Sequence, residues 1–217
     1  GTTWPVSLPL LGDFNVSNAL CAVGVASAAG LEIPVIVDAL ADASGVPGRL
    51  NPLNEGQPFS VVVDYAHTPA SLSKVLRLLR ELHACGRLIV VSGSAGERDP
   101  GKRPLQGAVM AELGDVSIVT SEDPRNENPE AIIRQIADGA RGQGAIDGET
   151  VFEIVDRREA ICHAMTIARA GDCVLLPGKG HETSIIWGFE HRPWNEAGVA
   201  REELIRLGFR SPEELRA

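Results

Sequence analysis

Several features that mark common classes of protein are scarce or missing in this sequence. Aromatic residues make up only 4% of the 217 residues, and no apolar run approaches the ~20 residues needed to span a bilayer. The first residues show no basic start followed by an apolar core, so they do not resemble a secretory signal. Acidic residues outnumber basic ones, which gives a net charge of −9. This balance argues against nucleic acid or an anionic membrane as the main partner.

Cysteine is present, but not in a metal-binding or redox pattern. The four cysteines form no C-x-x-C pair and sit in apolar contexts. We expect them to be small buried side chains in a reducing, cytoplasmic setting, and we predict no metal site in the chain. They are Cys21, Cys85, Cys162 and Cys173.

An initiator methionine is also missing, since the chain starts at Gly1 in the middle of a structural pattern. We therefore expect it to be part of a longer protein. The clearest linker is Gly45-Val46-Pro47-Gly48, where turn-forming residues separate two periodic segments. We place a domain boundary there, between a helical segment at residues 1–45 and a larger domain at residues 46–217.

Beyond the linker, strand-like and helix-like segments alternate regularly. The apolar runs lack polar alternation, which is typical of parallel strands buried on both faces. Helical stretches separate them, as expected for right-handed β-α-β units. The sequence therefore predicts an α/β fold: a Rossmann-like, mostly parallel sheet with helices on both faces, preceded by helices of another domain. The predicted strands cover residues 59–63, 88–92, 116–120, 151–154 and 173–176, and a hairpin turning at Gly188 and a last helix follow.

Charged and glycine-rich segments directly follow four of these strands. They cover residues 64–69, 96–103, 122–125 and 178–182. The carboxyl ends of the strands in an open parallel sheet line one crevice, where ligands bind. Four polar segments at four such ends predict one shared site for an anionic or zwitterionic ligand.

The segment at residues 96–103 nearly satisfies the P-loop pattern G-x-x-x-x-G-K-[ST]. Arg103 stands where the pattern needs a hydroxyl for Mg²⁺, and Glu97 and Asp99 put negative charge where backbone amides should meet phosphate. We therefore predict no nucleotide P-loop here. Two interpretations stay open: a loop whose basic residues meet carboxylate or phosphate oxygens, or a salt-bridged surface loop. These basic residues are Arg98, Lys102 and Arg103.

Single residues in these segments also allow a functional and a structural interpretation. Asp64 can accept hydrogen bonds from a ribose diol or position a metal-bound water, or it can cap the next turn. His67 can contact a phosphate or lie on the polar surface. Arg125 can grip a carboxylate with both arms of its guanidinium, or pair with a neighbouring glutamate. Glu182 can hold an ammonium group. Carboxylate-binding and amine-binding groups together indicate an amino acid as ligand.

The chain also carries six motifs in a fixed order. They are Gly12-Asp13-Phe14-Asn15-Val16-Ser17-Asn18, Gly48-Arg49-Leu50, Asp64-Tyr65-Ala66-His67-Thr68-Pro69, residues 96–103, Asp123-Pro124-Arg125 and residues 178–182. This order is similar to that of the Mur ligases, and within that family to the enzymes that add the third residue of the peptidoglycan stem peptide. The resemblance covers about residues 8–201, nearly the whole chain.

The resemblance implies the C-terminal part of an amide ligase that uses ATP and Mg²⁺. In such enzymes a central domain converts a carboxylate of UDP-MurNAc-L-Ala-D-Glu into an acyl phosphate, which the amine of an incoming amino acid attacks. Residues 1–45 would end the central ATP-binding domain, and residues 46–217 would bind the amino acid. The nucleotide would be contacted by Asn15, Asn18, Arg49, Asp64 and His67. The amino acid would be bound by Arg98, Asp123, Pro124, Arg125, Gly178 and Glu182.

Arg125 decides which substrate the resemblance implies. Arginine at this position resembles the family members that add meso-diaminopimelate, in which it grips the distal carboxylate. The alternatives are a lysine-adding ligase, a ligase similar to folylpolyglutamate synthetase, and a non-catalytic amino-acid-binding module. The chain departs from the family pattern at Glu122-Asp123, where Asp-Asn is typical, and at Glu97, where Asp is typical.

Three parts of the family's active site have no counterpart in these residues. The P-loop, the magnesium-binding carboxylate and the modified lysine are all expected upstream of Gly1. We therefore predict no catalytic residue within the chain and no ligase activity of this polypeptide alone. We expect the protein that contains it to be a monomer.

Overall fold

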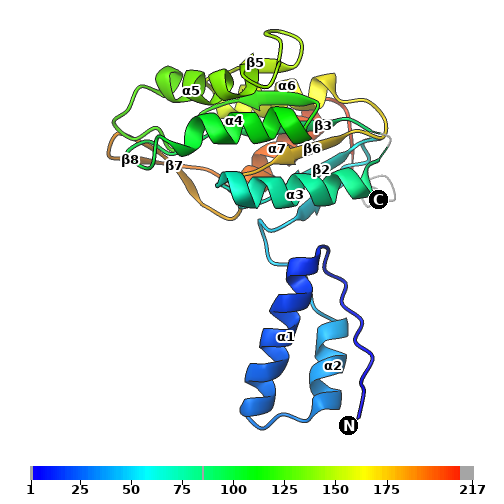
Figure 1. Ribbon diagram of the computed structural model, residues 1–217. Coiled ribbons are helices and arrows are strands. Elements are labelled where there is room, and N and C mark those ends of the chain that lie inside the picture. The colour runs from blue at the N-terminus through cyan, green and yellow to red at the C-terminus, as the bar shows by residue number, and fades with distance from the viewer. Residues whose placement is uncertain (1, 85, 211–217) are drawn as a thin grey trace. The chain divides into compact units, whose positions relative to one another are not determined.

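The computed structural model describes residues 2–84 and 86–210, and the chain divides at Val46/Pro47 into two compact units (Figure 1). The first unit holds α1 (Asp13–Ala28) and α2 (Ile33–Ala41). Pro34 lies in the first turn of α2, where its missing N–H costs nothing. Both helices were expected from the sequence. That this unit ends an ATP-binding domain stays a prediction.

The second unit is built on a six-stranded sheet in the order β1-β2-β6-β3-β4-β5. Only β1 is antiparallel to its neighbour, and all other neighbouring strands run parallel. The chain fills the order β2, β3, β4, β5 and then returns to insert β6 between β2 and β3. The strands are β1 (Asn51–Leu53), β2 (Ser60–Val63), β3 (Leu88–Ser92), β4 (Val116–Val119), β5 (Val151–Glu153) and β6 (Cys173–Leu176).

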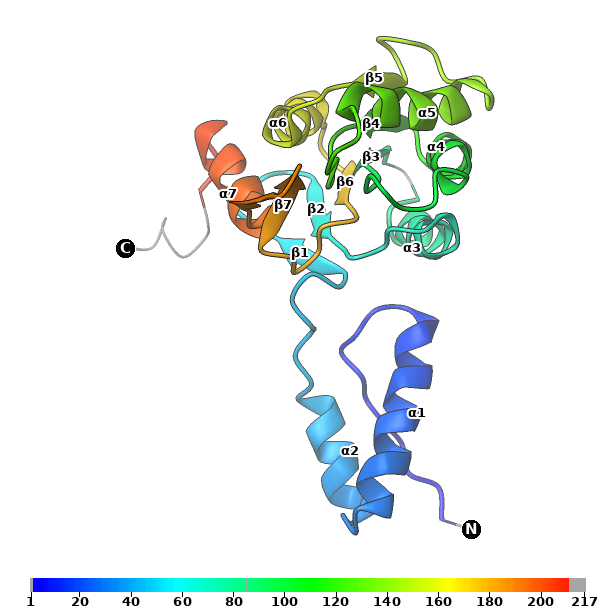
Figure 2. The ribbon, with the colours of Figure 1, turned by 90° about the vertical axis from the view of Figure 1, so that its left-hand side faces the viewer.

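Helices cover both faces of this sheet, as Figure 2 shows with α3, α4 and α5 on one side and α6 and α7 on the other. Their apolar residues form two separate clusters, one against each face of the sheet. Residues of β3, β4 and β6 are all buried, because a strand covered on both faces exposes neither set of side chains. The predicted fold class is therefore confirmed. The helices are α3 (Pro69–Leu82), α4 (Lys102–Leu113), α5 (Pro129–Arg141), α6 (Arg157–Ile167) and α7 (Glu196–Arg206).

Polar side chains cap three of the helices that follow strands. The Thr68 side chain accepts a hydrogen bond from the backbone N–H of Ser71, whose own hydroxyl bonds back to the Thr68 N–H. This reciprocal cap fixes the point where the chain leaves β2 and enters α3. Asn128 and Asp156 cap α5 and α6 without a reciprocal bond. In each case one side-chain oxygen accepts a hydrogen bond from a backbone N–H in the first turn. The loops between strand and helix are thus held at their helical ends.

Two elements outside the main alternation complete the unit. The hairpin of β7 (Ser184–Trp187) and β8 (Glu190–Pro193) turns at Gly188, which has φ +58°, as predicted. Strand β1 was not predicted. It has three residues, one of them Pro52, and it lies at the edge of the sheet, where a missing N–H is tolerated.

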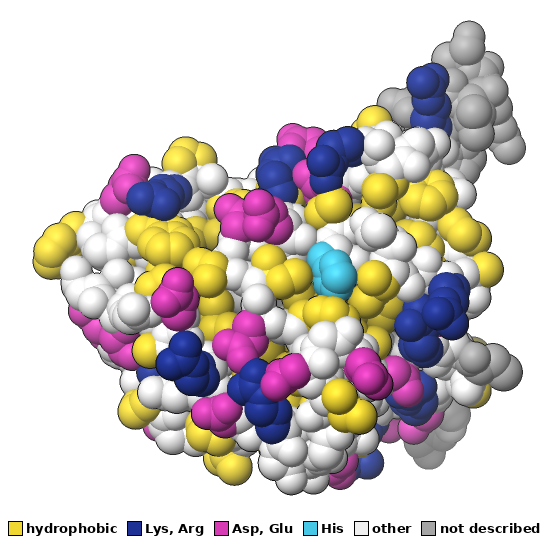
Figure 3. All heavy atoms as spheres, turned by 90° about the horizontal axis from the view of Figure 1, so that it is seen from above, with side chains coloured by type: hydrophobic (Ala, Val, Ile, Leu, Met, Phe, Trp, Pro, Cys, Tyr) yellow, Lys and Arg dark blue, Asp and Glu magenta, His cyan; other side chains and the backbone are white. Residues whose placement is uncertain are grey.

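The cysteine prediction is correct at one position and wrong at another. Cys173 is buried in β6, whereas Cys21 is exposed on α1, Cys162 is half-buried, and Cys85 lies outside the described residues. Burial raises the pKa of the Cys173 thiol to about 12, so this thiol stays protonated. Acidic and basic side chains are interspersed on the face seen in Figure 3. Among the described residues, no helix is long and apolar enough to cross a membrane.

Helices α4 and α5 approach each other closely because each has a glycine at the crossing. A Cβ on Gly107 would lie 1.8 Å from the Ile136 carbonyl oxygen, and one on Gly139 would lie 1.9 Å from that of Pro104. We expect Gly107→Ala to lower the free energy of unfolding by about 1–3 kcal/mol, because the helices must move apart. Urea unfolding of the chain measures this change.

Gly142→Ala is the matched control. Gly142 is exposed at the end of α5 with φ −61°, and the nearest atom to an added Cβ lies at 3.4 Å. Alanine there should change stability by less than about 0.5 kcal/mol. If both variants unfolded at the same urea concentration, the close helix contact would carry no energetic weight.

Candidate functional site

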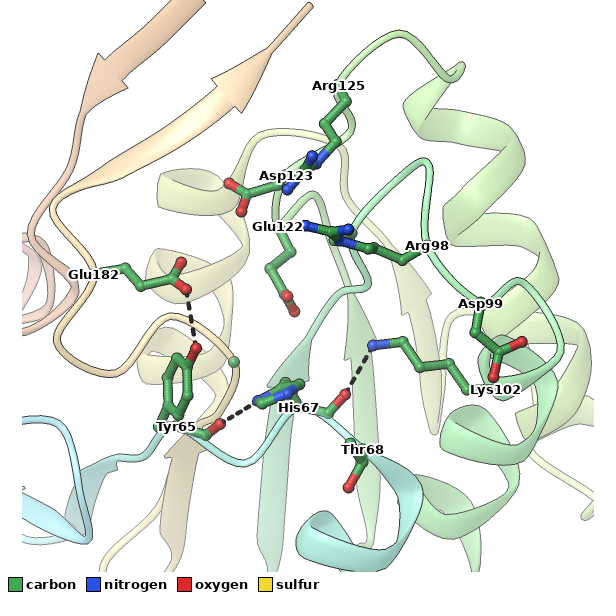
Figure 4. Close-up of a pocket in the computed structure, with 12 residues that line it drawn as sticks. Tyr65, His67, Thr68, Arg98, Asp99, Lys102, Glu122, Asp123, Arg125 and Glu182 are labelled. Atoms are coloured by element: carbon green, nitrogen blue, oxygen red, sulfur yellow. Dashed lines mark hydrogen bonds between the residues drawn. The ribbon is translucent and has the colours of Figure 1, made fainter.

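The carboxyl ends of four parallel strands, β2, β6, β3 and β4, are neighbours at one edge of the sheet. The four polar segments predicted from the sequence follow these four strands, and each contributes residues to one cavity of about 450 Å³ (Figure 4). Side chains of Tyr65, Arg98, Glu122 and Glu182 line it from different loops. The insertion of β6 between β2 and β3 makes this edge the switch point of the sheet, the usual place for a ligand.

Three cations in this cavity have no carboxylate partner among the described residues: Arg98, Lys102 and Arg125. The Lys102 ammonium donates a hydrogen bond of 2.9 Å to the carbonyl oxygen of His67. The Nε of Arg125 is buried and unbonded. The predicted alternative for Arg125, an ion pair with a nearby glutamate, is therefore not seen. Figure 4 shows Arg98 and Lys102 across the cavity from Glu182.

Arg125 is held by its backbone rather than by its side chain. Its N–H donates to the Ile186 carbonyl at 3.0 Å, and its own carbonyl accepts from the Gly188 N–H at 2.8 Å. The residue has φ +53°, a left-handed conformation that is rare for a residue with a Cβ. The β7–β8 hairpin thus aims Arg125 while its guanidinium stays available to a ligand.

Arg103 does not face the ligand, which corrects the sequence-based interpretation of the 96–103 loop. Its side chain is 1% exposed and bonds to Glu127 and to the Gln135 side chain, on the inner side of α4. Two of the loop's backbone amides are also occupied, since Glu97 N–H donates to the Glu127 carboxylate and Gly101 N–H to that of Asp99. These two amides are therefore not free for a phosphate.

Lys179 is completely buried between two carboxylates. Its ammonium donates to Asp123 Oδ1 at 2.9 Å and to Glu182 Oε2 at 2.5 Å. Asp123 Oδ1 also accepts from the Ile186 N–H at 2.9 Å. Asp123 is therefore a structural anchor of the cavity wall, and Glu182 presents to the cavity a carboxylate already oriented by Lys179.

Glu122 is the one carboxylate of the cavity that is buried without a partner among the described residues. Its side chain has no hydrogen bond. A Cβ added to Gly178 would lie only 2.6 Å from the Glu122 Oε2. Gly178 has φ +104°, so glycine is required there by both conformation and space. Burial raises the pKa of Glu122 to about 7, against the opposing effect of the nearby Arg157 and two lysines.

Tyr65 and His67 form the wall next to β2. The Tyr65 hydroxyl donates to Glu182 Oε1 at 3.4 Å, and its burial raises the pKa of this phenol, with the charge of Glu182 adding to the effect. The His67 ring lies against the Tyr65 ring, and its Nδ1 is 2.9 Å from the Tyr65 carbonyl oxygen. His67 thus lines the cavity with the predicted amino-acid ligands. Its nucleotide contact stays a prediction.

The other predicted nucleotide residues lie outside this cavity. Arg49 is exposed and stacks over the Tyr65 ring at 5.7 Å, so its guanidinium is free to meet a phosphate. Asp64 is buried, and its two oxygens accept from the backbone N–H groups of Leu50 and Ala66 at 2.8 and 2.7 Å. The capping interpretation of Asp64 is thus realised. A ribose contact stays a prediction.

Asn15 and Asn18 lie in the first unit and bond to each other. The Asn18 amide donates to Asn15 Oδ1 at 3.0 Å, and the Asn15 amide donates to the Leu11 carbonyl at 2.8 Å. These bonds shape the start of α1. The contacts of Asn15 and Asn18 with the nucleotide stay predictions.

No metal centre is formed in the part of the chain that the structure describes: no group of three or more His, Cys, Asp or Glu there could hold an ion. The expected magnesium ligands upstream of Gly1 stay a prediction. Pro124 is buried and stiffens the loop between Asp123 and Arg125 without offering a polar side chain. What the cavity can do chemically is hold a zwitterion, with its carboxylates on the cations and its ammonium at Glu182.

Sequence reasoning gave no role to three residues of this site: Tyr65, Glu122 and Lys179. Tyr65 and Lys179 lay within motifs that had been singled out, but nothing local indicated that their side chains meet Glu182. Glu122 had been noted only as a departure from the family pattern. A lysine between two glycines was the available signal for Lys179, since such a turn allows close backbone packing around it.

Known proteins are similar to this chain in sequence and in fold. Residues 48–180 match the family model described as "Mur ligase, glutamate ligase domain". The chain is 52% identical to a UDP-N-acetylmuramyl-tripeptide synthetase of Roseiflexus sp. (strain RS-1), over 93% of this chain and 40% of that protein. It is 45% identical to a UDP-N-acetylmuramoyl-L-alanyl-D-glutamate--2,6-diaminopimelate ligase of Geobacillus kaustophilus (strain HTA426), over 94% and 40%.

Solved structures give the same result. A UDP-N-acetylmuramoyl-L-alanyl-D-glutamate--2,6-diaminopimelate ligase superposes with a TM-score of 0.69 at 36% identity, covering 94% of this chain and 41% of that one. A folylpolyglutamate synthase of Mycobacterium tuberculosis reaches 0.64 at 21% identity over 80% of this chain and 39% of that one, which shows a shared fold alone. The chain spans about 40% of the length of the curated relatives named above. On this evidence the chain belongs to the Mur ligase family.

Proposed function

We propose that the chain is the amino-acid-binding part of an ATP-dependent ligase that adds meso-diaminopimelate to UDP-MurNAc-L-Ala-D-Glu. The observation that carries the proposal is the charge arrangement of the cavity. Within residues 2–84 and 86–210, Arg98, Lys102 and Arg125 lack carboxylate partners, and Glu182 lies across the cavity from Arg98 and Lys102. A ligand with two carboxylates and two amines fits both sets of groups.

The chain's own residues would bind and orient the incoming amino acid. Arg125 suits the distal carboxylate because its planar fork can donate two parallel hydrogen bonds. Glu182, held by Lys179 and Tyr65, suits an ammonium group of the same ligand. ATP, bound with Mg²⁺ mainly by the preceding domain, would supply the phosphoryl group that activates the acceptor carboxylate. Arg49 is the residue of this chain best placed to touch the nucleotide's phosphates, since it is exposed and unpaired among the described residues.

L-Lysine is the competing substrate, and it differs from diaminopimelate in lacking the distal carboxylate. With lysine bound, Arg125 would gain no anion, so lysine would lack the several kcal/mol that a matched charge pair contributes for diaminopimelate. Steady-state kinetics of the longer polypeptide that carries this chain should therefore give at least about 100-fold higher kcat/KM with meso-diaminopimelate than with L-lysine.

Three results would decide between the alternatives. Equal kcat/KM for the two amino acids would overturn the diaminopimelate assignment but keep the ligase. Binding of diaminopimelate by calorimetry without any ligation would identify a non-catalytic module. The 217-residue chain alone is expected to release no phosphate from ATP, and phosphate release by it would contradict the proposed division of labour between the domains.

A further inference from the structure

A buried ion pair lies beneath the cavity and takes no part in the ligand contacts described above. Arg157, the first residue of α6, is 2% exposed, and Glu196, the first residue of α7, is 1% exposed. The Arg157 guanidinium donates to both oxygens of Glu196, at 2.7–3.1 Å. The Trp194 indole N–H donates to Glu196 Oε2 at 2.5 Å. A pair this deeply buried is costly unless all its hydrogen-bonding groups are used.

The remaining donors of Arg157 bind two loops of the cavity. Its Nη1 donates to the Ser121 carbonyl at 3.3 Å, and its Nη2 donates to the Pro177 carbonyl at 3.0 Å. Ser121 precedes the 122–125 segment, and Pro177 precedes the 178–182 segment. These loops follow β4 and β6, which are not neighbours, because β3 runs between them. Among the described residues, no strand ladder joins the two loops. Two side chains link them directly: this guanidinium, and Lys179 through its bond to Asp123.

Arg157 also acts on the unpartnered carboxylate of the cavity. Its charge is the largest of the influences that oppose the burial-raised pKa of Glu122. Lys102 of α4 and Lys179 of the 178–182 segment act in the same direction, and Asp123 acts against them. Both Glu122 and Asp123 in turn favour the charged state of Arg157. The positive charge of Arg157 therefore helps to keep Glu122 ionised.

We propose that Arg157 is a positioning residue of the amino-acid cavity: one guanidinium, locked by Glu196, helps to set the separation of the loops that carry Arg125 and Glu182. The nature of the ligand in this inference rests on the proposed function. Arg125 and Glu182 are proposed to meet two groups of one ligand, so the separation of their loops has to match that ligand. A shift of either loop therefore weakens the binding of the amino acid, whereas Arg49, the residue proposed for the nucleotide's phosphates, lies in neither loop.

Arg157→Lys in the longer polypeptide tests the positioning role. Lysine keeps the charge but has one ammonium, which cannot reach Glu196, Ser121 and Pro177 together in the planar geometry of the fork. We expect KM for meso-diaminopimelate to rise about tenfold or more, as for the loss of one or two charge-assisted hydrogen bonds. KM for ATP and kcat at saturation should stay within about twofold.

Arg87→Lys is the matched control, because Arg87 makes the same kind of link at the opposite edge of the sheet. Its guanidinium bonds to Asp172 and to the Ile167 carbonyl, at the amino ends of β3 and β6. This variant should lose stability with KM for diaminopimelate unchanged. An Arg157→Lys enzyme with a lower melting temperature but the wild-type KM would overturn the proposal, as would an equal rise of KM in Arg87→Lys.

A second measurement needs no ligase activity. In the 217-residue chain, the ¹³C shift of the Glu122 carboxyl followed against pH should show titration near pH 7. Arg157→Gln should move this midpoint up by about one pH unit or more, while Arg157→Lys should leave it nearly unchanged. An unchanged midpoint in Arg157→Gln would contradict the position of the Arg157 guanidinium against the two loops. Absence of ligation by the wild-type longer polypeptide would instead sink the proposed function, and this titration would still report on Arg157.

Discussion

Replacing Arg125 by alanine is expected to lower kcat/KM for meso-diaminopimelate by about 100- to 1,000-fold, or about 3–4 kcal/mol. The same change should alter kcat/KM for L-lysine by less than about tenfold. The physical reason is the state of the guanidinium, which is half-buried with an unbonded Nε and has no carboxylate partner among the described residues. It is thus held ready for an anion, and the variant leaves the distal carboxylate of the ligand desolvated and unmatched.

The structure offers sharp controls for this variant. Alanine at position 125 adds no backbone strain, because arginine already carries a Cβ at φ +53°. Arg125→Lys keeps the charge but loses the fork, so its kcat/KM should fall between those of wild type and Arg125→Ala. Arg134→Ala removes an exposed arginine of α5, outside the cavity, and should change nothing. If Arg125→Ala reduced kcat/KM equally for both amino acids, Arg125 would not recognise the distal carboxylate.

The positions of the buried strands could be predicted because their signal is local. The predicted bounds of β3 (Leu88–Ser92) and β6 (Cys173–Leu176) agree with the structure to the residue. Both are uninterrupted apolar runs flanked by turn-forming residues, which is what burial on two faces demands. Strand β1 (Asn51–Leu53) has neither length nor periodicity, and it becomes a strand only by pairing with β2 in the folded unit. Nothing in its own three residues indicates that pairing.

The place of the site was predictable for a topological reason, but the roles of its charges were not. Parallel strands bring their carboxyl ends to one edge whatever residues follow them. Which charges pair across that edge depends on contacts distant in sequence, such as Lys179 with Asp123, 56 residues apart. Lys102 and Arg103 show most clearly that the sequence does not indicate which charges face the cavity. They are adjacent in the first turn of α4, about 100° apart around the helix, so one meets the cavity and the other turns inward to Glu127.

Replacing Lys179 by methionine is expected to lower the free energy of unfolding of the 217-residue chain by about 3–5 kcal/mol. Methionine has a similar length, so the change removes charge rather than volume. Lys179 is fully buried and donates to both Asp123 and Glu182. Without it, the carboxylates of Asp123 and Glu182 lie close together with no cation between them and little water around them. Urea unfolding at neutral pH measures the loss.

Two further variants separate charge from packing. Lys74→Met changes an exposed lysine of α3 and should shift stability by less than about 0.5 kcal/mol. Adding Asp123→Asn to Lys179→Met removes one of the two stranded charges, while the amide oxygen can still accept from the Ile186 N–H. The double variant should therefore regain part of the lost stability, a non-additive result that is expected for a direct charge pair. Two results would contradict this role of the ion pair: a Lys179→Met protein as stable as Lys74→Met, or a double variant less stable than Lys179→Met alone. Either result would mean that packing around the glycine turn holds Glu182 in the cavity wall.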